Sequence, residues 1–182
     1  RAAAAPPPPA AGLPGPNFLG RRGELLGSNP QSIQGDRAVV SVLEQMKTPG
    51  RCVVDAGEIP DLIPVLAVCA AGRNGGTTVF SNAARLRLKE SDRLETTAAL
   101  IRDLGGKVRE GADFLEVDGT GGLSGGTADS CSDHRIAMAA AVAATVCRGP
   151  VRVLGAECVA KSYPDFWKDY EALGGIAAVS NG

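Results

Sequence analysis

The chain has 182 residues, 44% of them hydrophobic and 21% charged, which is enough apolar material for one sizeable domain or two small ones. Its 19 basic and 20 acidic residues give a formal net charge of -1. This balance gives no electrostatic basis for binding nucleic acid or a membrane surface, so any anion site must be local.

The first 26 residues differ in composition from the rest. They begin RAAAAPPPPAAGLPGP, without an initiator Met or a charged region followed by a Leu-rich one, and therefore do not resemble a secretory signal. Their Pro and Ala content predicts an extended, disordered arm over 1–26. We interpret the chain as a fragment of a longer protein, or this arm as the product of a displaced translation start.

From about Leu26 the composition is that of a globular protein, with short strand and helix patterns in alternation. Pro64 lies early in the second predicted helix, so that helix must begin late or bend. The first four predicted elements are a helix over 36–47, a strand over 51–55, a helix over 59–72 and a strand over 76–81.

The second half continues in the same way. Asp92 and Glu95 are spaced as a capping box, and Gly105 and Gly106 end the helix that follows. The remaining elements are a helix over 91–106, a hairpin of strands at 107–110 and 113–119, a helix over 132–147, a strand over 151–155 and a helix over 164–175. Strands that alternate with helices predict an α/β fold.

The five cysteines are odd in number, far apart and without C-x-x-C spacing. We expect them to be free thiols in a reducing cytoplasm, because neither a disulfide framework nor a metal site has this pattern. The longest apolar run, 136–147, is shorter than the ~20 residues that span a bilayer. It predicts a buried Ala-rich helix.

Two helix starts resemble each other: SDRL at 91–94 and SDHRI at 132–136. Ser and Asp are common caps, so this similarity alone leaves an internal repeat undecided. An Arg in the first turn is unfavourable beside the positive end of the helix dipole unless an anion lies nearby. Arg93 and Arg135 are therefore candidates for anion sites, or else each is neutralised by a neighbouring acid.

Positive charge is crowded between residues 85 and 94, where Arg85, Arg87, Lys89 and Arg93 surround Glu90. If this segment is a strand, Arg87 and Lys89 share one face. A solvated charged face is the alternative. Taken singly, Asp61, His134 and Lys161 are more typical of structural or solvent-facing roles, and none of them carries a function alone.

Five segments together resemble the 5-enolpyruvylshikimate-3-phosphate synthase family, the enolpyruvyl transferases of the shikimate pathway. LKESDRL and DHRIAMA are highly specific, and the resemblance extends over nearly all of 27–174. In the family's order, the segments are GSNPQSIQGD (27–36), GEIPD (57–61), RLRLKESDRL (85–94), SDHRIAMA (132–139) and AKSYPDF (160–166).

The resemblance implies two similar domains of repeated βαβαββ units, an inside-out α/β barrel, with the substrates in the cleft between them. Residues 27–182 would form part of the C-terminal domain, with the N-terminal domain and the opening unit of this one missing. It also implies a cytoplasmic enzyme, usually monomeric, that uses no metal and no organic cofactor.

The family transfers the enolpyruvyl group of phosphoenolpyruvate to the 5-hydroxyl of shikimate 3-phosphate and releases phosphate. Matched by motif, Asp61 resembles the base that accepts the hydroxyl proton, and Glu90 resembles the acid that protonates the methylene carbon. The resemblance also implies that Lys161 shares in proton transfer. The implied substrate contacts are Asp61, Arg85 and Lys89 for shikimate 3-phosphate, and Arg93, Arg135 and Lys161 for phosphoenolpyruvate.

Lys89 and Arg93 favour the charged form of Glu90, so we expect it to become an acid only after bound substrate anions neutralise these cations. Two alternatives remain. One is the fold-related transferase acting on UDP-N-acetylglucosamine, which the KESDRL and DHR segments disfavour. The other is an inactive fragment or anion-binding pseudoenzyme, because the cleft needs the missing N-terminal domain.

Overall fold

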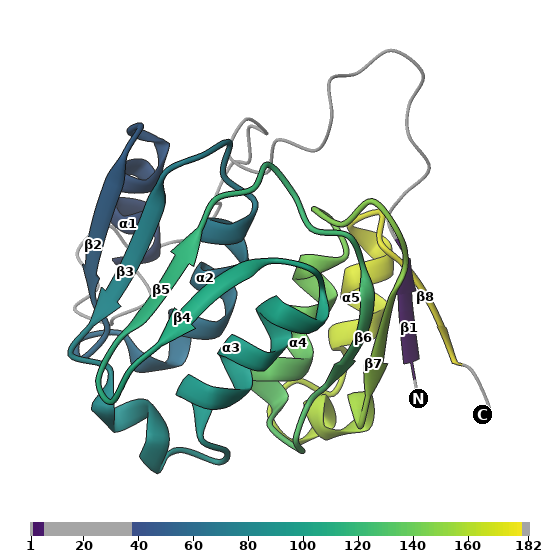
Figure 1. The fold of residues 1–182 in the computed structure, drawn as a ribbon. Helices are drawn as coiled ribbons and strands as arrows, with labels where there is room; N and C mark the ends of the chain where they lie inside the picture. Colours follow the sequence, from purple (N-terminus) through teal and green to yellow (C-terminus); the bar gives the residue numbers. More distant parts are fainter. Residues whose placement is uncertain (1, 6–37, 180–182) are drawn as a thin grey trace.

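The computed structural model describes residues 2–5 and 38–179 (Figure 1). Three short 3-10 helices, η3 (Pro60–Leu62), η4 (Ala84–Leu88) and η5 (Ala156–Lys161), connect the main elements. The helices are α1 (Ala38–Lys47), α2 (Ile63–Ala71), α3 (Arg93–Asp103), α4 (His134–Ala143) and α5 (Phe166–Ala172). The strands are β1 (Ala2–Ala5), β2 (Arg51–Asp55), β3 (Thr77–Ser81), β4 (Lys107–Glu110), β5 (Leu115–Asp118), β6 (Gly126–Asp129), β7 (Val151–Leu154) and β8 (Ile176–Val179).

The first half of the described chain forms one βαβαββ unit. Its sheet has the order β2-β3-β5-β4, in which β2 and β3 are parallel and the other two pairs are antiparallel. Helices α2 and α3 make the two connections that precede β3 and β4. This unit agrees with the repeat that the sequence resemblance implies.

The second sheet repeats these strand directions in the order β6-β7-β1-β8. Strands β6 and β7 are parallel, while β1 is antiparallel to both β7 and β8. Here the third strand position is filled from the N-terminal end of the chain, beside the yellow β8 in Figure 1. The second unit is therefore completed by a segment that lies far away in the sequence.

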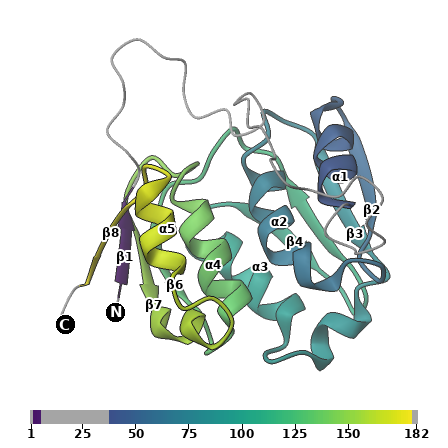
Figure 2. The same cartoon turned by 180° about the vertical axis from the view of Figure 1, so that it is seen from behind.

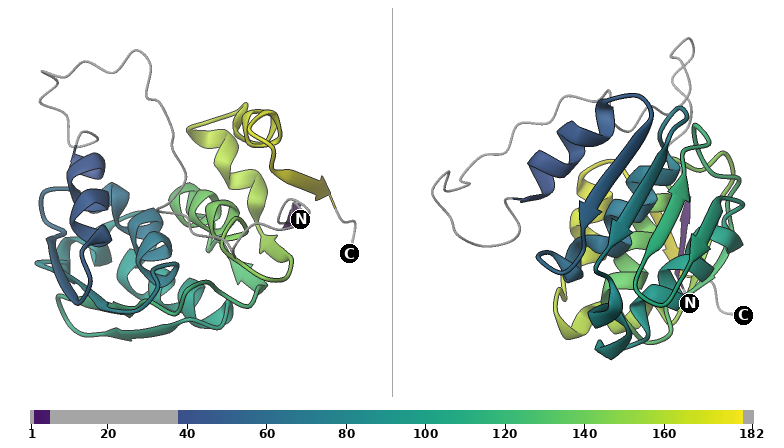
Figure 3. Two further views of the ribbon diagram at one scale, coloured as in Figure 1. Left: turned by 90° about the horizontal axis from the view of Figure 1, so that it is seen from above. Right: turned by 60° about the vertical axis from the view of Figure 1, so that its left-hand side comes forward.

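The helices α2, α3, α4 and α5 lie on one side of the sheets, as the rear and top views show (Figures 2 and 3). Strand β2 alternates exposed and buried residues, as a strand covered on one face should. Helices α2 and α4 pack against each other and join the two units. Small residues such as Ala67, Ala71 and Ala140 are fully buried and let these helices approach closely.

Most elements agree with the sequence predictions. Helix α2 begins at Ile63, after η3, so Pro64 lies in its first turn where no backbone N–H is needed. Gly105, at a φ of +83°, follows the end of α3. The Ala-rich run from residue 136 is buried in and after α4.

Three predictions need correction. Residues 2–5, expected in a disordered arm, form β1, because sheet edges on both sides accept their backbone; the rest of that arm lies outside the described residues. The segment from residue 84 to 88 is 3-10 helix, so Arg87 and Lys89 do not share a strand face. Strands β6 and β8, rich in Gly and Ala, were not predicted at all.

No helix in the described residues is both long enough and apolar enough to cross a membrane.

We predict that Leu66→Ala lowers the free energy of unfolding by about 2–5 kcal/mol, because it leaves a cavity in fully buried α2. Urea titration followed by circular dichroism measures this loss. Leu88, 85% exposed, is the matched control, and its change to Ala should cost less than about 0.5 kcal/mol. Equal losses in the two variants would contradict the assigned core.

Candidate functional site

The starts of α3 and α4 are built alike, each with an Asp at the N-cap position. Asp92 accepts hydrogen bonds from the amides of Leu94 (3.2 Å) and Glu95 (3.1 Å). Asp133 accepts from the amide of Arg135 at 2.9 Å. The predicted N-cap at Asp92 is confirmed, Asp133 caps α4 in the same way, and each helix start carries an Arg in its first turn.

Arg93 joins these two helix starts through a buried two-pronged ion pair. Its Nε donates to Oδ2 of Asp133 at 2.7 Å, and its Nη2 donates to Oδ1 at 3.1 Å. The side chain of Arg93 is 4% exposed and that of Asp133 is 0% exposed. Ser91 adds a hydrogen bond to Oδ2 at 3.0 Å. The buried carboxylate is thus fully hydrogen-bonded, as a buried charge must be.

Burial by itself would raise the pKa of Asp133, but the hydrogen bonds from Arg93, the Arg135 amide and Ser91 outweigh it. The pKa of Asp133 is therefore lowered, and the carboxylate stays ionised. Its negative charge neutralises Arg93, as one of the two alternatives for this Arg requires. The guanidinium of Arg93 has five N–H groups. Two donate to Asp133 and one donates to Asp61, so two have no partner among these acids.

Asp61 lies on the solvent side of the same guanidinium. Its Oδ1 accepts from Nη1 of Arg93 at 2.7 Å and lies 3.1 Å from Nζ of Lys89. Burial opposes ionisation, yet Lys89 and then Arg93 and Arg135 lower the pKa of Asp61. Lys89 and Arg93 hold Asp61 as a carboxylate, which makes it a weak proton acceptor.

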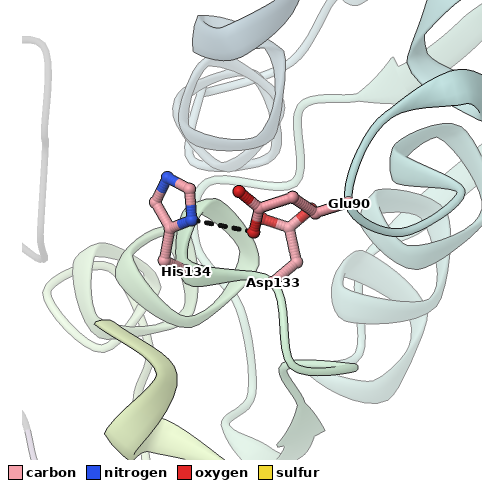
Figure 4. A group of neighbouring side chains, drawn as sticks. All are labelled: Glu90, Asp133 and His134. Atoms are coloured by element: carbon pink, nitrogen blue, oxygen red, sulfur yellow. Dashed lines mark hydrogen bonds and ion pairs between the residues drawn. The ribbon is translucent and has the colours of Figure 1, made fainter. Parts of the chain in front are cut away.

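Glu90 pairs with the lone histidine across the two helix starts (Figure 4). Its Oε2 lies 3.0 Å from Nδ1 of His134, whose ring is buried while Glu90 is 44% exposed. Together with Asp133, these side chains have ligand atoms within 4.8 Å of one another. They fit a metal ion poorly, because both oxygens of Asp133 already accept hydrogen bonds from Arg93.

The loop before α4 is held in an uncommon backbone conformation. Cys131 and Ser132 both have positive φ, at 50° and 58°, although neither is glycine. Asp129 Oδ1 accepts from the Cys131 amide, and the Ser130 hydroxyl accepts from the Ser132 amide. These bonds stabilise the turn that delivers Asp133 and His134 to the cluster.

The other predicted site residues lie at the ends of neighbouring elements. Arg85 is exposed on η4, Lys161 is exposed at the end of η5, and Arg135 is half-buried in α4. Among the residues that the structure describes, none of these three side chains has a hydrogen-bond or ion-pair partner. Arg87 faces elsewhere, pairing with Asp92 at 2.7 Å.

The structure thus brings Asp61, Lys89, Glu90 and Arg93 into one cluster with the start of α4. Sequence reasoning assigned no site role to Ser91, Asp133 or His134. The signal for Asp133 was its place in the second Ser-Asp helix start, which is also the signature of an ordinary cap. Its long-range bond to Arg93 depends on the packing of two helices and has no local pattern.

We predict that Asp133→Asn lowers the free energy of unfolding at pH 7 by about 3 kcal/mol, since it leaves Arg93 buried without its counter-charge. Urea titration measures the loss. Glu44→Gln, which removes one member of an exposed ion pair with Lys47, is the control and should cost less than about 0.5 kcal/mol.

The difference in free energy of unfolding between the unsubstituted chain and Asp133→Asn depends on pH in a defined way. Because the folded-state pKa of Asp133 is lowered, its stabilisation is complete above the unfolded value of ~3.9 and is lost as the pH falls through the folded value. The difference between the two proteins should therefore shrink only below about pH 4. A difference that stays constant down to about pH 2 would contradict the assignment.

Comparison with known proteins matches the EPSP synthase (3-phosphoshikimate 1-carboxyvinyltransferase) family over residues 24–170. A 3-phosphoshikimate 1-carboxyvinyltransferase of Clostridium kluyveri is 43% identical over 173 residues, which is 86% of this chain and 40% of the relative. One from Clostridium acetobutylicum is 45% identical over 161 residues, 81% of this chain and 37% of the relative. The chain thus spans about two fifths of the length of these relatives.

A solved EPSP synthase from Acinetobacter baumannii superposes with a TM-score of 0.65 at 31% identity. The match covers 72% of this chain and 32% of the solved one. The family match over residues 24–170 includes every residue of the cluster. The chain belongs to the EPSP synthase family.

Proposed function

We propose that this chain supplies part of an active site that transfers the enolpyruvyl group of phosphoenolpyruvate to the 5-hydroxyl of shikimate 3-phosphate. The observation that carries the proposal is the juxtaposition of Asp61, Lys89, Glu90 and Arg93 in one cluster. Membership of the EPSP synthase family supports the reaction. As the chain spans about two fifths of its relatives, the rest of the site lies outside it.

Cations in this cluster and on the elements next to it suit two anionic substrates. Arg93, Arg135 and Lys161 hold the phosphate and carboxylate of phosphoenolpyruvate, and Arg85 and Lys89 contact shikimate 3-phosphate. Fixed cations cancel the repulsion between the two anions without reorganising during the reaction. Asp133 and Asp61 together take three N–H groups of Arg93, which leaves two for an anion.

The proton transfers follow from the two acidic groups. The 5-hydroxyl oxygen bonds to C2 of phosphoenolpyruvate as Asp61 takes the hydroxyl proton, and Glu90 gives a proton to C3. The bond from C2 to the phosphate oxygen then breaks as C3 returns a proton to the Glu90 carboxylate, and the departing phosphate takes up the proton that Asp61 accepted. Lys161 shares in these proton transfers, and no metal or organic cofactor takes part.

Substrate binding changes the strength of both groups. Substrate anions compete with Asp61 for Lys89 and Arg93, which now lower the pKa of Asp61. Once these cations face substrate, Asp61 becomes a stronger base, and Glu90 becomes a usable acid as water is excluded. The reducing cytoplasm is the proposed location, which five free cysteines favour.

We predict that the chain alone releases no phosphate above background from phosphoenolpyruvate and shikimate 3-phosphate. A hybrid in which it replaces the matching segment of the Clostridium kluyveri relative should release phosphate. A colorimetric phosphate assay measures both. Turnover by the chain alone would contradict the proposal that part of the active site lies outside it. A folded but inactive hybrid would favour the alternative that the chain is an anion-binding pseudoenzyme.

In that hybrid, we predict that Glu90→Gln lowers kcat by about 10²–10⁴, because the amide cannot protonate C3. The pH profile of kcat should also change, because the proposed proton donor is absent. Glu157→Gln, an exposed change outside the cluster, is the control and should leave kcat within about twofold. An unchanged pH profile in Glu90→Gln would remove Glu90 from the mechanism.

A further inference from the structure

Arg87 lies in the cation-rich segment but has no role in the chemistry proposed above. Its guanidinium instead donates to three acceptors. Nη1 donates to Oδ2 of Asp92 at 2.7 Å, and Nη2 and Nε donate to the carbonyl oxygens of Gly111 at 2.7 Å and of Ala112 at 3.2 Å. The side chain is 31% exposed, so these bonds are partly sheltered from solvent. A planar guanidinium can hold several acceptors in fixed directions at once, which an ammonium group does less well.

The bond from Arg87 to Asp92 closes a short loop in the chain. These two residues flank 88–91, which run from the end of η4 to the start of α3. Lys89 and Glu90 lie within this loop. The Asp92 carboxylate also caps α3, because its Oδ1 accepts from two amides of the first turn. One oxygen of Asp92 therefore holds the helix while the other holds the loop through Arg87.

The two carbonyl acceptors of Arg87 belong to the turn between β4 and β5. The amide of Gly111 closes this turn by donating to the carbonyl oxygen of Phe114 at 2.9 Å. The Phe114 ring packs so closely on Gly111 that a Cβ there would lie 2.1 Å from it. The amide of Ala83, just before η4, donates to the carbonyl oxygen of Asp113 in the same turn at 2.7 Å. The turn is therefore a fixed support to which η4 is bonded through both backbone and side chain.

Apolar packing holds the two ends of the loop but not the loop itself. Leu86 and Leu94 are fully buried on either side of it. In contrast, no side chain from 87 to 92 is buried, and Leu88 is 85% exposed. A segment with few buried apolar contacts has low local stability. Polar contacts must therefore determine the conformation of this loop.

In the function proposed above, two polar contacts of the loop belong to groups that act on substrate. Lys89, which pairs with Asp61, contacts shikimate 3-phosphate. Glu90, which pairs with His134, gives a proton to C3 of phosphoenolpyruvate. The partners of Arg87 are an N-cap carboxylate and two backbone carbonyls, and none of them is a proposed substrate contact. The bonds of Arg87 can therefore persist while the side chains in the loop change partners.

We propose that Arg87 is a positioning residue of the active site, which fixes the loop that carries Lys89 and Glu90 against the turn between β4 and β5. This inference rests on the proposed function and adds to it an anchor outside the substrate-binding cluster. Arg87 acts through these two residues and is not itself a substrate contact. Arg93 is held separately, by its buried pair with Asp133. The two parts of the site therefore depend on different anchors.

The kinetic test uses the hybrid with the Clostridium kluyveri relative. In Arg87→Gln we expect kcat to fall at least about tenfold and KM for shikimate 3-phosphate to rise at least about fivefold, since Glu90 and Lys89 lose their fixed positions. KM for phosphoenolpyruvate should stay within about twofold, because Arg93 keeps its bond to Asp133. A loss of folding alone lowers the amount of active protein and leaves both KM values unchanged, so it does not produce this pattern.

Arg102→Gln is the matched control. Arg102 is exposed and pairs with Glu110 at 2.9 Å beside the same turn, and its change should leave kcat and both KM values within about twofold. Arg87→Lys keeps the charge but loses the planar fork, so it should recover only part of the loss in kcat. Full recovery by lysine, or equal rises in the two KM values of Arg87→Gln, would overturn the proposal. Circular dichroism checks folding, and Arg87→Lys replaces Arg87→Gln if the latter is unfolded, with the same expected directions.

A second experiment needs no activity and so separates this proposal from the proposed function. His134 is the single histidine of the chain, and its Nδ1 lies 3.0 Å from Oε2 of Glu90, so its ring ¹⁵N resonances in the full chain report that contact. We expect Arg87→Gln to shift them in the direction that Glu90→Gln does, and Arg102→Gln to leave them unchanged. Unshifted resonances in a folded Arg87→Gln chain would overturn the proposal. Shifted resonances beside an inactive hybrid would contradict the proposed function and still support the anchoring of Glu90 by Arg87.

Discussion

The buried ion pair between Arg93 and Asp133 is the interaction on which the site depends. It joins the N-terminus of α3 to the N-terminus of α4, and so fixes the two βαβ units against each other. Removing either partner would leave an unpaired charge in a dry environment, which is far costlier than losing a surface pair. Lys89, Glu90 and Arg135 are all attached to these two helix starts, so the same bond sets their relative positions.

The pair also settles a choice that charge patterns alone leave open. Arg93 was a candidate either for an anion site or for neutralisation by an acid, and the geometry allows both at once. Asp133 takes two of its N–H groups on the buried side, while Asp61 takes one on the solvent side. Asp61 is the more exposed of the two acids, so its contact with Arg93 is the one that is open to solvent.

The sequence was sufficient where structure follows from local rules. Asp92 caps α3 as its spacing predicts, and Pro64 lies in the first turn of α2, where a proline is tolerated. It was insufficient where a contact spans distant segments. The bond from Arg93 to Asp133 links residues 40 apart, and β1 pairs with strands near the other end of the chain. Residues 84–88 alternate as a strand would, but they form the 3-10 helix η4, in which Leu86 is fully buried.

The repeat explains why such long-range contacts recur. Each unit presents a parallel strand pair and a helix whose capped N-terminus faces the cluster, so two units side by side place two positive helix ends together. Two helix ends and several cations would repel one another unless acids were set among them. Asp61, Glu90 and Asp133 supply that charge in the described chain, from full burial to nearly half exposure. This gradient leaves Asp133 enclosed in its ion pair with Arg93, while Asp61 and Glu90 face solvent.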